Sequence, residues 1–526
     1  MNDESEEVKK VPSLFHNYIS FLGTAIALAS LCSALLLILI DLSGNTKGAY
    51  LGIFAYVLLP GALTFGLLVI VAGMLLERRR RRRLSPAEIA QFPRVDFNNP
   101  HSRRVFFGFI ALSTVFVFMS AFGSYRAYEH TESVAFCGQT CHETMKPEFV
   151  AYGVSPHAHV LCVECHVGNG PEGYARSKIT GAYQLYAIAF NKVPKPITTP
   201  VHTLPSVHET CEQCHWPSRF YGNKLKTISR YAYDEQNTLR SLRMLINVGG
   251  GDPSTGPVAG IHWHMNLANE ITFIASDDHR QVIPWVRVKD AQGNVTEYID
   301  RNWPPSPELL AKGERRRMDC IDCHSRPAHA YLPPDVALDQ AFAGGRLDTN
   351  LPYLKREAVA VLSKPYTSTP EALTSISSGL DQFYRTNYAD LSSSKSESIK
   401  AATKEIQRIF QTYFFPEMKT DWQTHPNNIG HLYSSGCFRC HDGDHVSNTG
   451  KVIRNDCNIC HSVLYDSAGP PEKNARTGAF QHPVDLGALA DRKCETCHKA
   501  NKPFQHPVNL GDISMFQCVE CHPRKN

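Results

Sequence analysis

The cysteines of this chain lie in pairs, and a histidine directly follows each pair. Seven copies follow the pattern C-x-x-C-H, and an eighth, in the stretch FCGQTCHETM, has three residues between its cysteines. These eight motifs use all but one of the 17 cysteines. In chain order the pairs are Cys137 and Cys141, Cys162 and Cys165, Cys211 and Cys214, Cys320 and Cys323, Cys437 and Cys440, Cys457 and Cys460, Cys494 and Cys497, and Cys518 and Cys521.

The pattern C-x-x-C-H is typical of covalent attachment of c-type haem. Two thioether bonds hold the porphyrin, and the adjacent histidine binds the iron as its proximal ligand. Zinc sites or disulfides are the alternatives, but zinc would need pairs of motifs to close its tetrahedra and would not require the histidine every time. The sequence therefore predicts eight covalently bound haem c groups, with the proximal ligands His142, His166, His215, His324, His441, His461, His498 and His522.

The chain has more histidines than the proximal positions need. Of its 24 histidines, fourteen lie in the region of the motifs without following a cysteine pair, and at most eight distal positions await them. An iron with two axial ligands carries electrons, whereas an iron with an open position can bind substrate. The surplus of histidine therefore favours electron transfer over substrate chemistry.

Position in the chain selects candidates for the distal ligands. His482 and His506 occupy the same place in a repeat, FQHPVDLG and FQHPVNLG, and each precedes the next cysteine by twelve residues. The stretch GIHWHMN offers His262 or His264, of which we expect one to be a ligand, because alternate residues of a strand point opposite ways. Around the fifth motif we expect two ligands among His425, His431 and His445.

Three stretches without charge are long enough to cross a hydrocarbon core: residues 19–40, 50–76 and 105–124. The first has an acidic flank and no cleavage site for a signal peptidase, so we expect a retained helix. Six consecutive arginines, 78–83, lie between the second and third stretches, which places this loop in the cytoplasm. The motifs then lie on the outer side, where c-type haem is attached. The sequence thus predicts a multi-pass protein of the cytoplasmic (inner) membrane, with its haem region in the periplasm.

The rest of the chain divides into modules. Residues 1–124 form the predicted membrane domain, 125–335 a tetrahaem module, 336–420 a helical connector and 421–526 a second tetrahaem module. A β insert is expected at about 220–318, where VIPWVRVKDAQGNVTEYID is typical of a hairpin. The predicted fold is mainly α, with extensive irregular structure. We expect small connecting elements, because haems supply most of the buried apolar surface.

The region from 105 to 335 resembles the quinol dehydrogenases of the NapC/NirT family. A membrane helix runs straight into the first motif, a methionine follows the motif's histidine, and Ser-Pro-His and CVECHV come next. The fourth motif, CIDCHSRPAHAYLP, looks like the last motif of that family. The resemblance implies that His157 and His329 are distal ligands. This chain has three apolar stretches and eight motifs, more than typical members, and is similar in this to the larger inner-membrane cytochromes of metal-reducing bacteria.

The same resemblance implies a quinol site beside the first motif. Lys178, twelve residues after His166, matches the lysine that lies near quinol in the family, and Gln184 or Tyr186 stands where some members have an acidic residue. A lysine in an interfacial helix can hydrogen-bond a quinol oxygen, or it can extend to water or phosphate instead. Family members use the methionine as an iron ligand, which would raise that haem's potential.

At the first motif the sequence leaves the ligand open. If the segment is helical, Met145 lies on the same face as His142 and competes with it for one side of the iron, leaving the opposite face for quinol.

The leading hypothesis is a quinol dehydrogenase that oxidises quinol, menaquinol above all, and passes electrons to soluble periplasmic c-type cytochromes. A terminal reductase of a small inorganic substrate is the first alternative. A pure electron conduit without its own quinol site is the second, and electron flow into the quinone pool is a third. The net charge of +4 gives no reason to expect a nucleic-acid partner, whereas the apolar stretches require a lipid bilayer.

Overall fold

The computed structural model describes residues 13–42, 59–82, 97–140, 142–167, 170–201, 204–216, 219–250, 259–265 and 268–467. The chain forms two compact units. The first comprises Met1–Cys137 with Val167–Ala182, and the second comprises Gly138–His166 with Tyr183–Asn526. About half of the described residues are helical and some form sheet, which supports the predicted fold class in part.

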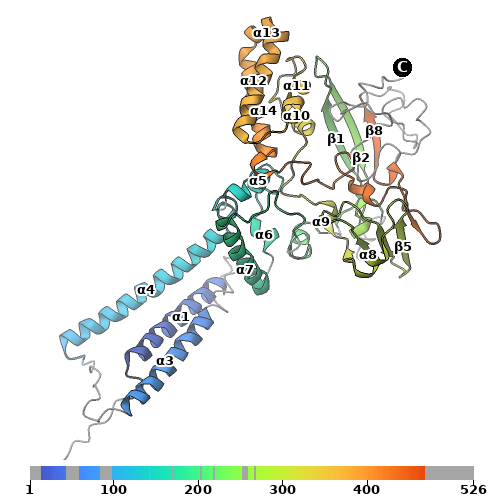
Figure 1. Ribbon diagram of the computed structural model, residues 1–526. Coiled ribbons are helices and arrows are strands. Elements are labelled where there is room, and N and C mark those ends of the chain that lie inside the picture. Colours follow the sequence, from blue (N-terminus) through green and yellow to red (C-terminus); the bar gives the residue numbers. More distant parts are fainter. Residues whose placement is uncertain are drawn as a thin grey trace, which may run out of the picture. The chain divides into compact units, whose positions relative to one another are not determined.

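The first unit contains three helices that are long and apolar enough to span a membrane. They are α1 (Tyr18–Leu42), α3 (Leu59–Arg81) and α4 (Pro100–Glu132) (Figure 1). Residues 50–58 of the predicted second span lie outside the described residues. The third helix is longer than the predicted 105–124 at both ends, because charged residues such as Arg103 and Glu129 end a hydrocarbon span without ending a helix.

Small residues bring α1 and α3 close together. A side chain added at Gly23 would lie 2.7 Å from the carbonyl oxygen of Gly66, so these two backbones are in direct contact. Ser20 Oγ donates a hydrogen bond to the carbonyl of Ile70 across the same interface, at 3.2 Å. Close backbone approach between small residues is the usual way in which membrane helices associate.

The second unit has short helices at its cysteine motifs and a helical region of its own. Its α-helices are α5 (His142–Gly153), α6 (Cys162–His166), α8 (Pro307–Lys312), α9 (Cys320–Cys323), α10 (Pro334–Ala343), α11 (Leu354–Leu362), α12 (Thr369–Asn387), α13 (Ala389–Ser394) and α14 (Ser396–Tyr413). Short 3-10 turns are η4 (Cys211–Gln213), η6 (Ile261–Met265), η7 (Pro416–Met418), η8 (Gly436–Arg439) and η9 (Cys457–Ile459). Helix α7 (Gly170–Ala189) contributes residues to both units.

Two antiparallel sheets complete the second unit. The first has the order β1-β2-β8 and the second β6-β3-β4-β5-β7. The strands are β1 (Lys224–Tyr231), β2 (Leu239–Ile246), β3 (Glu270–Ile274), β4 (Trp285–Lys289), β5 (Val295–Asp300), β6 (Arg316–Arg317), β7 (His445–Ser447) and β8 (His461–Asp466). The predicted hairpin is present as β4 and β5. The sheets are not confined to 220–318, however, because β7 and β8 come from the fifth and sixth motifs and pair with the insert.

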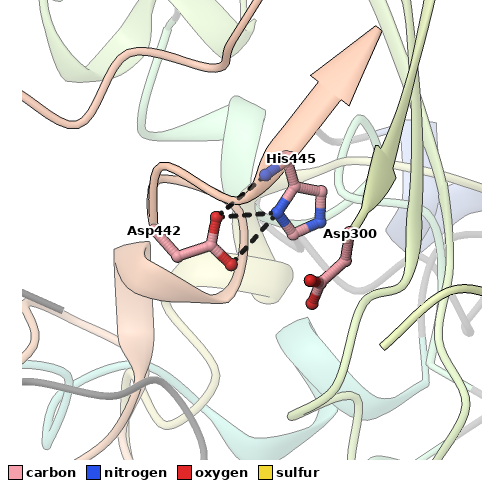
Figure 2. Close-up of side chains that lie close together, drawn as sticks. All are labelled: Asp300, Asp442 and His445. Carbon is pink, nitrogen blue, oxygen red and sulfur yellow. Dashed lines mark hydrogen bonds and ion pairs between the residues drawn. The ribbon is translucent and has the colours of Figure 1, made fainter. Parts of the chain in front are cut away.

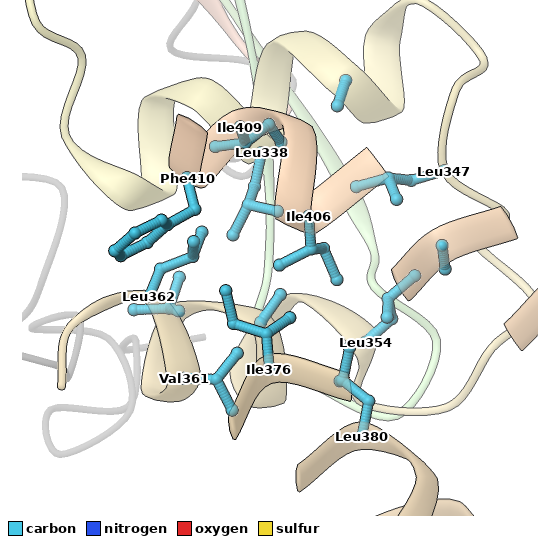
Figure 3. Packing of buried hydrophobic residues seen from close by; sticks show 14 of the residues in the cluster. Leu338, Leu347, Leu354, Val361, Leu362, Ile376, Leu380, Ile406, Ile409 and Phe410 are labelled. Carbon is cyan, nitrogen blue, oxygen red and sulfur yellow. The ribbon is translucent and has the colours of Figure 1, made fainter. Parts of the chain in front are cut away.

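The connector is more substantial than expected. Helices α10, α11, α12 and α14 enclose an apolar core of their own (Figure 3). In the sequence Ile399, Ile406, Ile409 and Phe410 recur at helical spacing, which predicts one apolar face. On α14 this stripe is buried in the core. Each such side chain contributes about 1.5–3 kcal/mol when it is fully buried. The expectation that haems replace a separate core was therefore wrong for this region, which carries no cysteine and must bury its own apolar faces.

Candidate functional site

Histidine rings face one another in pairs in the second unit, and each pair contains one motif histidine. The pairs and their ring-centroid separations are His166–His329 at 6.2 Å, His215–His157 at 6.0 Å, His324–His262 at 6.5 Å, His441–His264 at 5.8 Å and His461–His431 at 6.2 Å. They belong to the second through sixth motifs. Every motif histidine whose side chain the structure describes is thus paired.

The spacing of these pairs fits a metal held between two imidazoles. A metal–nitrogen bond of about 2 Å on each side, with about 1 Å from each nitrogen to its ring centroid, gives roughly 6 Å between centroids. Haem iron takes two axial ligands of this kind, and the two cysteines that the porphyrin needs lie directly before one histidine of each pair. The residues present therefore fit haem c.

Hydrogen bonds to main-chain carbonyls fix the orientation of half of these rings. The Nδ1 atoms bond to main-chain carbonyls: His157 to Pro327 at 3.1 Å, His329 to Glu148 at 3.0 Å, His262 to Val248 at 3.1 Å, His264 to Ile261 at 2.7 Å and His441 to Arg454 at 2.5 Å. A carbonyl only accepts, so Nδ1 carries the proton and Nε2 keeps its lone pair for a metal. Burial also lowers the pKa of His264, His329 and His441, which favours the neutral, ligating form.

One short segment supplies two of the five distal rings. His262 and His264 both lie on η6, where the sequence suggested a strand and a single ligand. The segment is a 3-10 turn, in which residues two apart point about 120° away from each other. Consequently His262 faces the fourth motif and His264 faces the fifth.

Successive motifs lie next to one another in chain order. The Cys165 thiol interacts with Cys211, and the side chain of Cys211 hydrogen-bonds Cys320, which is the largest cause of the raised pKa of Cys320. Cys323 lies within electrostatic reach of Cys437, and Cys460 lies within electrostatic reach of Cys437. Thioether sulfurs do not titrate, so the proximity of the motifs is what matters. It makes motifs two to six a continuous series.

A cavity of about 420 Å³ lies beside His264, the ring paired with the histidine of the fifth motif. It is lined by His264, by Arg280 and Arg316, and by residues that immediately precede the third and fourth motifs, such as His208 and Asp319. Planar guanidinium groups suit carboxylates such as the propionates of a haem. The arginines that line the cavity therefore suit a haem, as the paired histidine rings do.

Two predicted distal candidates are not paired with a motif histidine. His445 is fully buried, and its Nδ1 and Nε2 donate to Asp442 at 3.0 Å and to the carbonyl of Ile283 at 2.7 Å (Figure 2). Burial opposes protonation, but the bond to Asp442 raises the pKa of His445. With both ring nitrogens protonated and engaged, His445 offers no lone pair to iron.

His425 has a different environment. Its Nδ1 bonds Thr199 Oγ1 at 3.0 Å, and its ring lies 6.1 Å from the ring of Tyr331. Burial lowers its pKa to about 4, so the ring is neutral. Its Nε2 has no hydrogen-bond partner among the described residues. Among the motif histidines whose side chains the structure describes, none faces His425 or His445, whereas His461 faces His431.

The irregular first motif has a local structural explanation. Phe136–Thr140 forms one turn of π-helix, η3, which takes one residue more per turn than an α-helix and so accommodates the additional residue between Cys137 and Cys141. Helix α5 then begins at His142 and carries Met145, which is half-buried. Cys141 and the side chain of His142 lie outside the described residues, so the ligand of this motif stays a prediction.

Three of the predicted quinol residues, Lys178, Gln184 and Tyr186, lie on helix α7, whereas Met145 lies on α5. Position 186 follows position 178 by about two turns, whereas position 184 falls on another side. Lys192 Nζ donates to the hydroxyl of Tyr186 at 2.7 Å, a contact that the sequence did not suggest. Ile179, Tyr183 and Tyr186 are exposed, as expected of a helix at a lipid interface. The side chain of Lys178 is not among those described.

The seventh and eighth motifs lie outside the described residues. The predictions for Cys494, Cys497, Cys518 and Cys521, for His498 and His522, and for His482 and His506 therefore stay predictions.

Comparisons with known proteins agree with this site. Residues 99–199 match the model of the NapC/NirT cytochrome c family, N-terminal region. Over 494 residues the chain is 40% identical to cytochrome c-type protein ImcH of Geobacter sulfurreducens, covering 94% of this chain and 97% of that protein. No solved structure matches the chain.

The chain therefore belongs to the NapC/NirT family of c-type cytochromes. It is a multihaem electron-transport protein of the inner membrane with covalently bound haem c, as the sequence predicted.

Proposed function

We propose that this NapC/NirT-family cytochrome oxidises quinol, menaquinol above all, and relays the electrons through eight haem c groups to soluble periplasmic c-type cytochromes. The observation that carries the proposal is the set of five histidine pairs on five successive motifs. A haem c at each motif would supply reversible one-electron transfer. The chain's own residues fix the spacing, the orientation and the axial ligands.

The axial ligand set follows from the pairs. We assign His329, His157, His262, His264 and His431 as the distal ligands of motifs two to six, in that order. His425 and His445 are not in this set. In two cases, His329 with His166 and His264 with His441, the distal histidine lies more than 160 residues from its partner, so these pairs also tie distant segments together.

The pairs favour a relay over a terminal reductase. A reductase of nitrite or a sulfur oxyanion needs an iron with an open coordination position. At motifs two to six an imidazole stands on each side of the place where the iron would lie. This supports electron transfer at these five motifs, and it leaves the first motif as the place where a small molecule could approach.

Electron entry is assigned to α7. Oxidation of one quinol releases two electrons and two protons and leaves a quinone. A lysine at position 178 would hydrogen-bond a quinol oxygen and favour loss of its proton. The protons pass to periplasmic water, and the electrons pass singly along the motifs. The exposed apolar residues of α7 support a position of this helix at the membrane surface, where quinol is available.

The test is anaerobic mixing of the purified full-length protein with a reduced menaquinol analogue, followed by haem absorbance. We expect rapid reduction in the wild type and a reduction rate roughly tenfold or more slower in Lys178→Ala, the loss of one charge-assisted hydrogen bond. Dithionite should reduce both proteins equally. Lys400→Ala is the matched control, because Lys400 is exposed and pairs only with Glu397 on the surface of α14.

Two results would overturn parts of this proposal. If no quinol reduces the wild type while dithionite does, the protein is a conduit without its own quinol site. If Lys178→Ala reacts with quinol as fast as the wild type, the lysine has no part in the site.

A further inference from the structure

An arginine inside the fifth motif locks that motif to the fourth. Arg439, between Cys437 and Cys440, is 6% exposed. Its Nη2 donates to the carbonyl of Asp322, between Cys320 and Cys323, at 2.6 Å. Its Nη1 donates to the carbonyl of Arg280 at 2.8 Å, and its Nε to that of Gly436 at 2.9 Å. The guanidinium is therefore fixed between the two cysteine-bearing turns.

The charge of Arg439 has no carboxylate to offset it directly. All three of these hydrogen bonds end on main-chain carbonyls, and no carboxylate among the described residues forms an ion pair with Arg439. The Asp322 carboxylate is shared by Arg280 at 3.5 Å and Arg316 at 2.8 Å. Asp319 pairs with Arg316 at 2.7 Å. Arg280 and Arg316 thus share the two carboxylates at this junction, and the buried guanidinium of Arg439 contacts only neutral main-chain carbonyls among the described residues.

An acidic cluster lies just after the fifth motif. Asp442, which directly follows His441, accepts hydrogen bonds from His445, and Asp300 lies beside this pair. Neither carboxylate forms an ion pair with Arg439 among the described residues. Because the guanidinium is buried, its charge acts more strongly on its surroundings than a charge in water would.

The guanidinium lies beside the cysteine-bearing turns of both motifs. Arg439 stands between the two cysteines of its own motif, and its Nη2 bonds the carbonyl of Asp322, the residue before Cys323. Its fixed charge is therefore held next to the fourth motif as well as the fifth.

We propose that Arg439 sets the reduction potentials at the fourth and fifth motifs, raising both by the positive charge that it buries between them. Reduction adds one negative charge at the iron, so a nearby fixed positive charge favours the reduced state. The inference needs haem c at these two motifs, and in that respect it rests on the proposed function. Because a higher potential favours the reduced state, electrons would then collect at this junction between the two predicted tetrahaem modules.

The ring geometry makes the two positions distinguishable by spectroscopy. The planes of His262 and His324 lie 4° apart, whereas those of His264 and His441 lie 87° apart. Parallel and perpendicular axial imidazoles give ferric low-spin EPR signals of different anisotropy. The fourth and fifth motifs stand at the two extremes among the five pairs.

The experiment is a mediated redox titration of the full-length protein, followed by EPR, on Arg439→Met and Arg439→Lys. In Arg439→Met we expect the ferrous-to-ferric ratio of both signals, at a fixed potential, to fall on the order of tenfold. That change corresponds to a shift of about 59 mV for a one-electron couple. Arg439→Lys keeps the charge and should keep both midpoints. Arg385→Met, on the exposed face of α12, is the control and should change nothing.

Equal shifts in the Met and Lys variants would make Arg439 a packing residue, and unchanged midpoints in Arg439→Met would refute its role outright. If Arg439→Met assembles without its full complement of haem, Arg439→Gln replaces it, because the amide can still donate to a carbonyl. The titration uses mediators and no quinol. A protein that fails to oxidise quinol therefore still gives a full answer for Arg439.

Discussion

At the scale of residues, the direction of a ring matters as much as its identity. His264 reaches the fifth motif only because η6 turns it away from His262, and the hydrogen bond from its Nδ1 to Ile261 holds it there. The carbonyl fixes the tautomer, and the tautomer presents Nε2 to the metal. Four of the five assigned distal histidines, His157, His262, His264 and His329, therefore depend on a main-chain carbonyl that a sequence motif does not record.

Replacing His264 tests this assignment. In His264→Met we expect the EPR signal of the perpendicular pair to disappear, the potential of one haem to rise, and a charge-transfer band of methionine–histidine ligation to appear. The measurement is EPR and near-infrared absorption of the oxidised protein. His445→Gln is the comparison. Both ring nitrogens of His445 are engaged, Nδ1 with Asp442 (Figure 2) and Nε2 with the carbonyl of Ile283, so this change should leave every ligation signal unchanged. The opposite pattern, with the signal lost in His445→Gln only, would exchange the roles of these two residues.

The sequence could predict a ligand only where its position relative to a motif identifies it. Proximal histidines follow their cysteines directly, and His157 and His329 came from a family resemblance. That both His262 and His264 are paired could not be predicted, because the segment was expected to be a strand and proved to be a 3-10 turn. Arg439 was not singled out either, although its place between two motif cysteines was the available signal.

At the scale of elements, the β1–β2 hairpin is fastened to the connector by buried polar groups. Asn237, at the hairpin turn with φ of 46°, donates to the carbonyls of Thr349 and Leu351 and accepts from the amide of Lys355. Asparagine tolerates this left-handed conformation better than most residues. The fully buried Lys355 Nζ donates to Asp339 Oδ1 at 2.7 Å and to the carbonyl of Tyr231 at 2.6 Å.

Removing one partner of this pair should be costly. In Lys355→Met we expect the free energy of unfolding to fall by about 3–5 kcal/mol, because Asp339 is left buried without its counter-charge. Burial already raises the pKa of Asp339 and lowers that of Lys355. Denaturant unfolding followed by far-UV circular dichroism measures the loss, and Lys355→Met with Asp339→Asn should recover part of it. Lys400→Met removes an exposed ion pair with Glu397, so its free energy of unfolding should change by less than about 1 kcal/mol. A similarly small change in Lys355→Met would show that the buried pair does not stabilise the connector.

Element types followed the sequence patterns well, and boundaries followed them less well. The stripe of α14 and the β4–β5 hairpin have strong periodicity and were predicted. Strands β7 and β8 were not, because each is short and forms only by pairing with a strand about 145 to 225 residues earlier. Hydropathy gave the core of α4 but not its length, since it measures transfer into lipid and not helix formation.

At the scale of the whole protein, the order of the motifs in the chain is also their order in space, from the second to the sixth. Distal histidines interleave this series, because His157 precedes the second motif yet faces the third, and His329 follows the fourth yet faces the second. In a linear series, electrons have no second route around a missing haem. Loss of one member should therefore separate the members before it from those after it.

Removing the fifth attachment site tests the order. In a Cys437→Ser, Cys440→Ser variant we expect menaquinol to reduce rapidly only the four haems before the gap, while the three beyond it stay oxidised on the same timescale. The matched variant Cys457→Ser, Cys460→Ser interrupts the series one step later, so five haems should be reduced rapidly. Stopped-flow absorbance of the α band gives these fractions, and dithionite gives the total in each variant. Rapid reduction of all seven remaining haems in the first variant, or equal fractions in both, would mean that electrons bypass the fifth motif and that the series is branched.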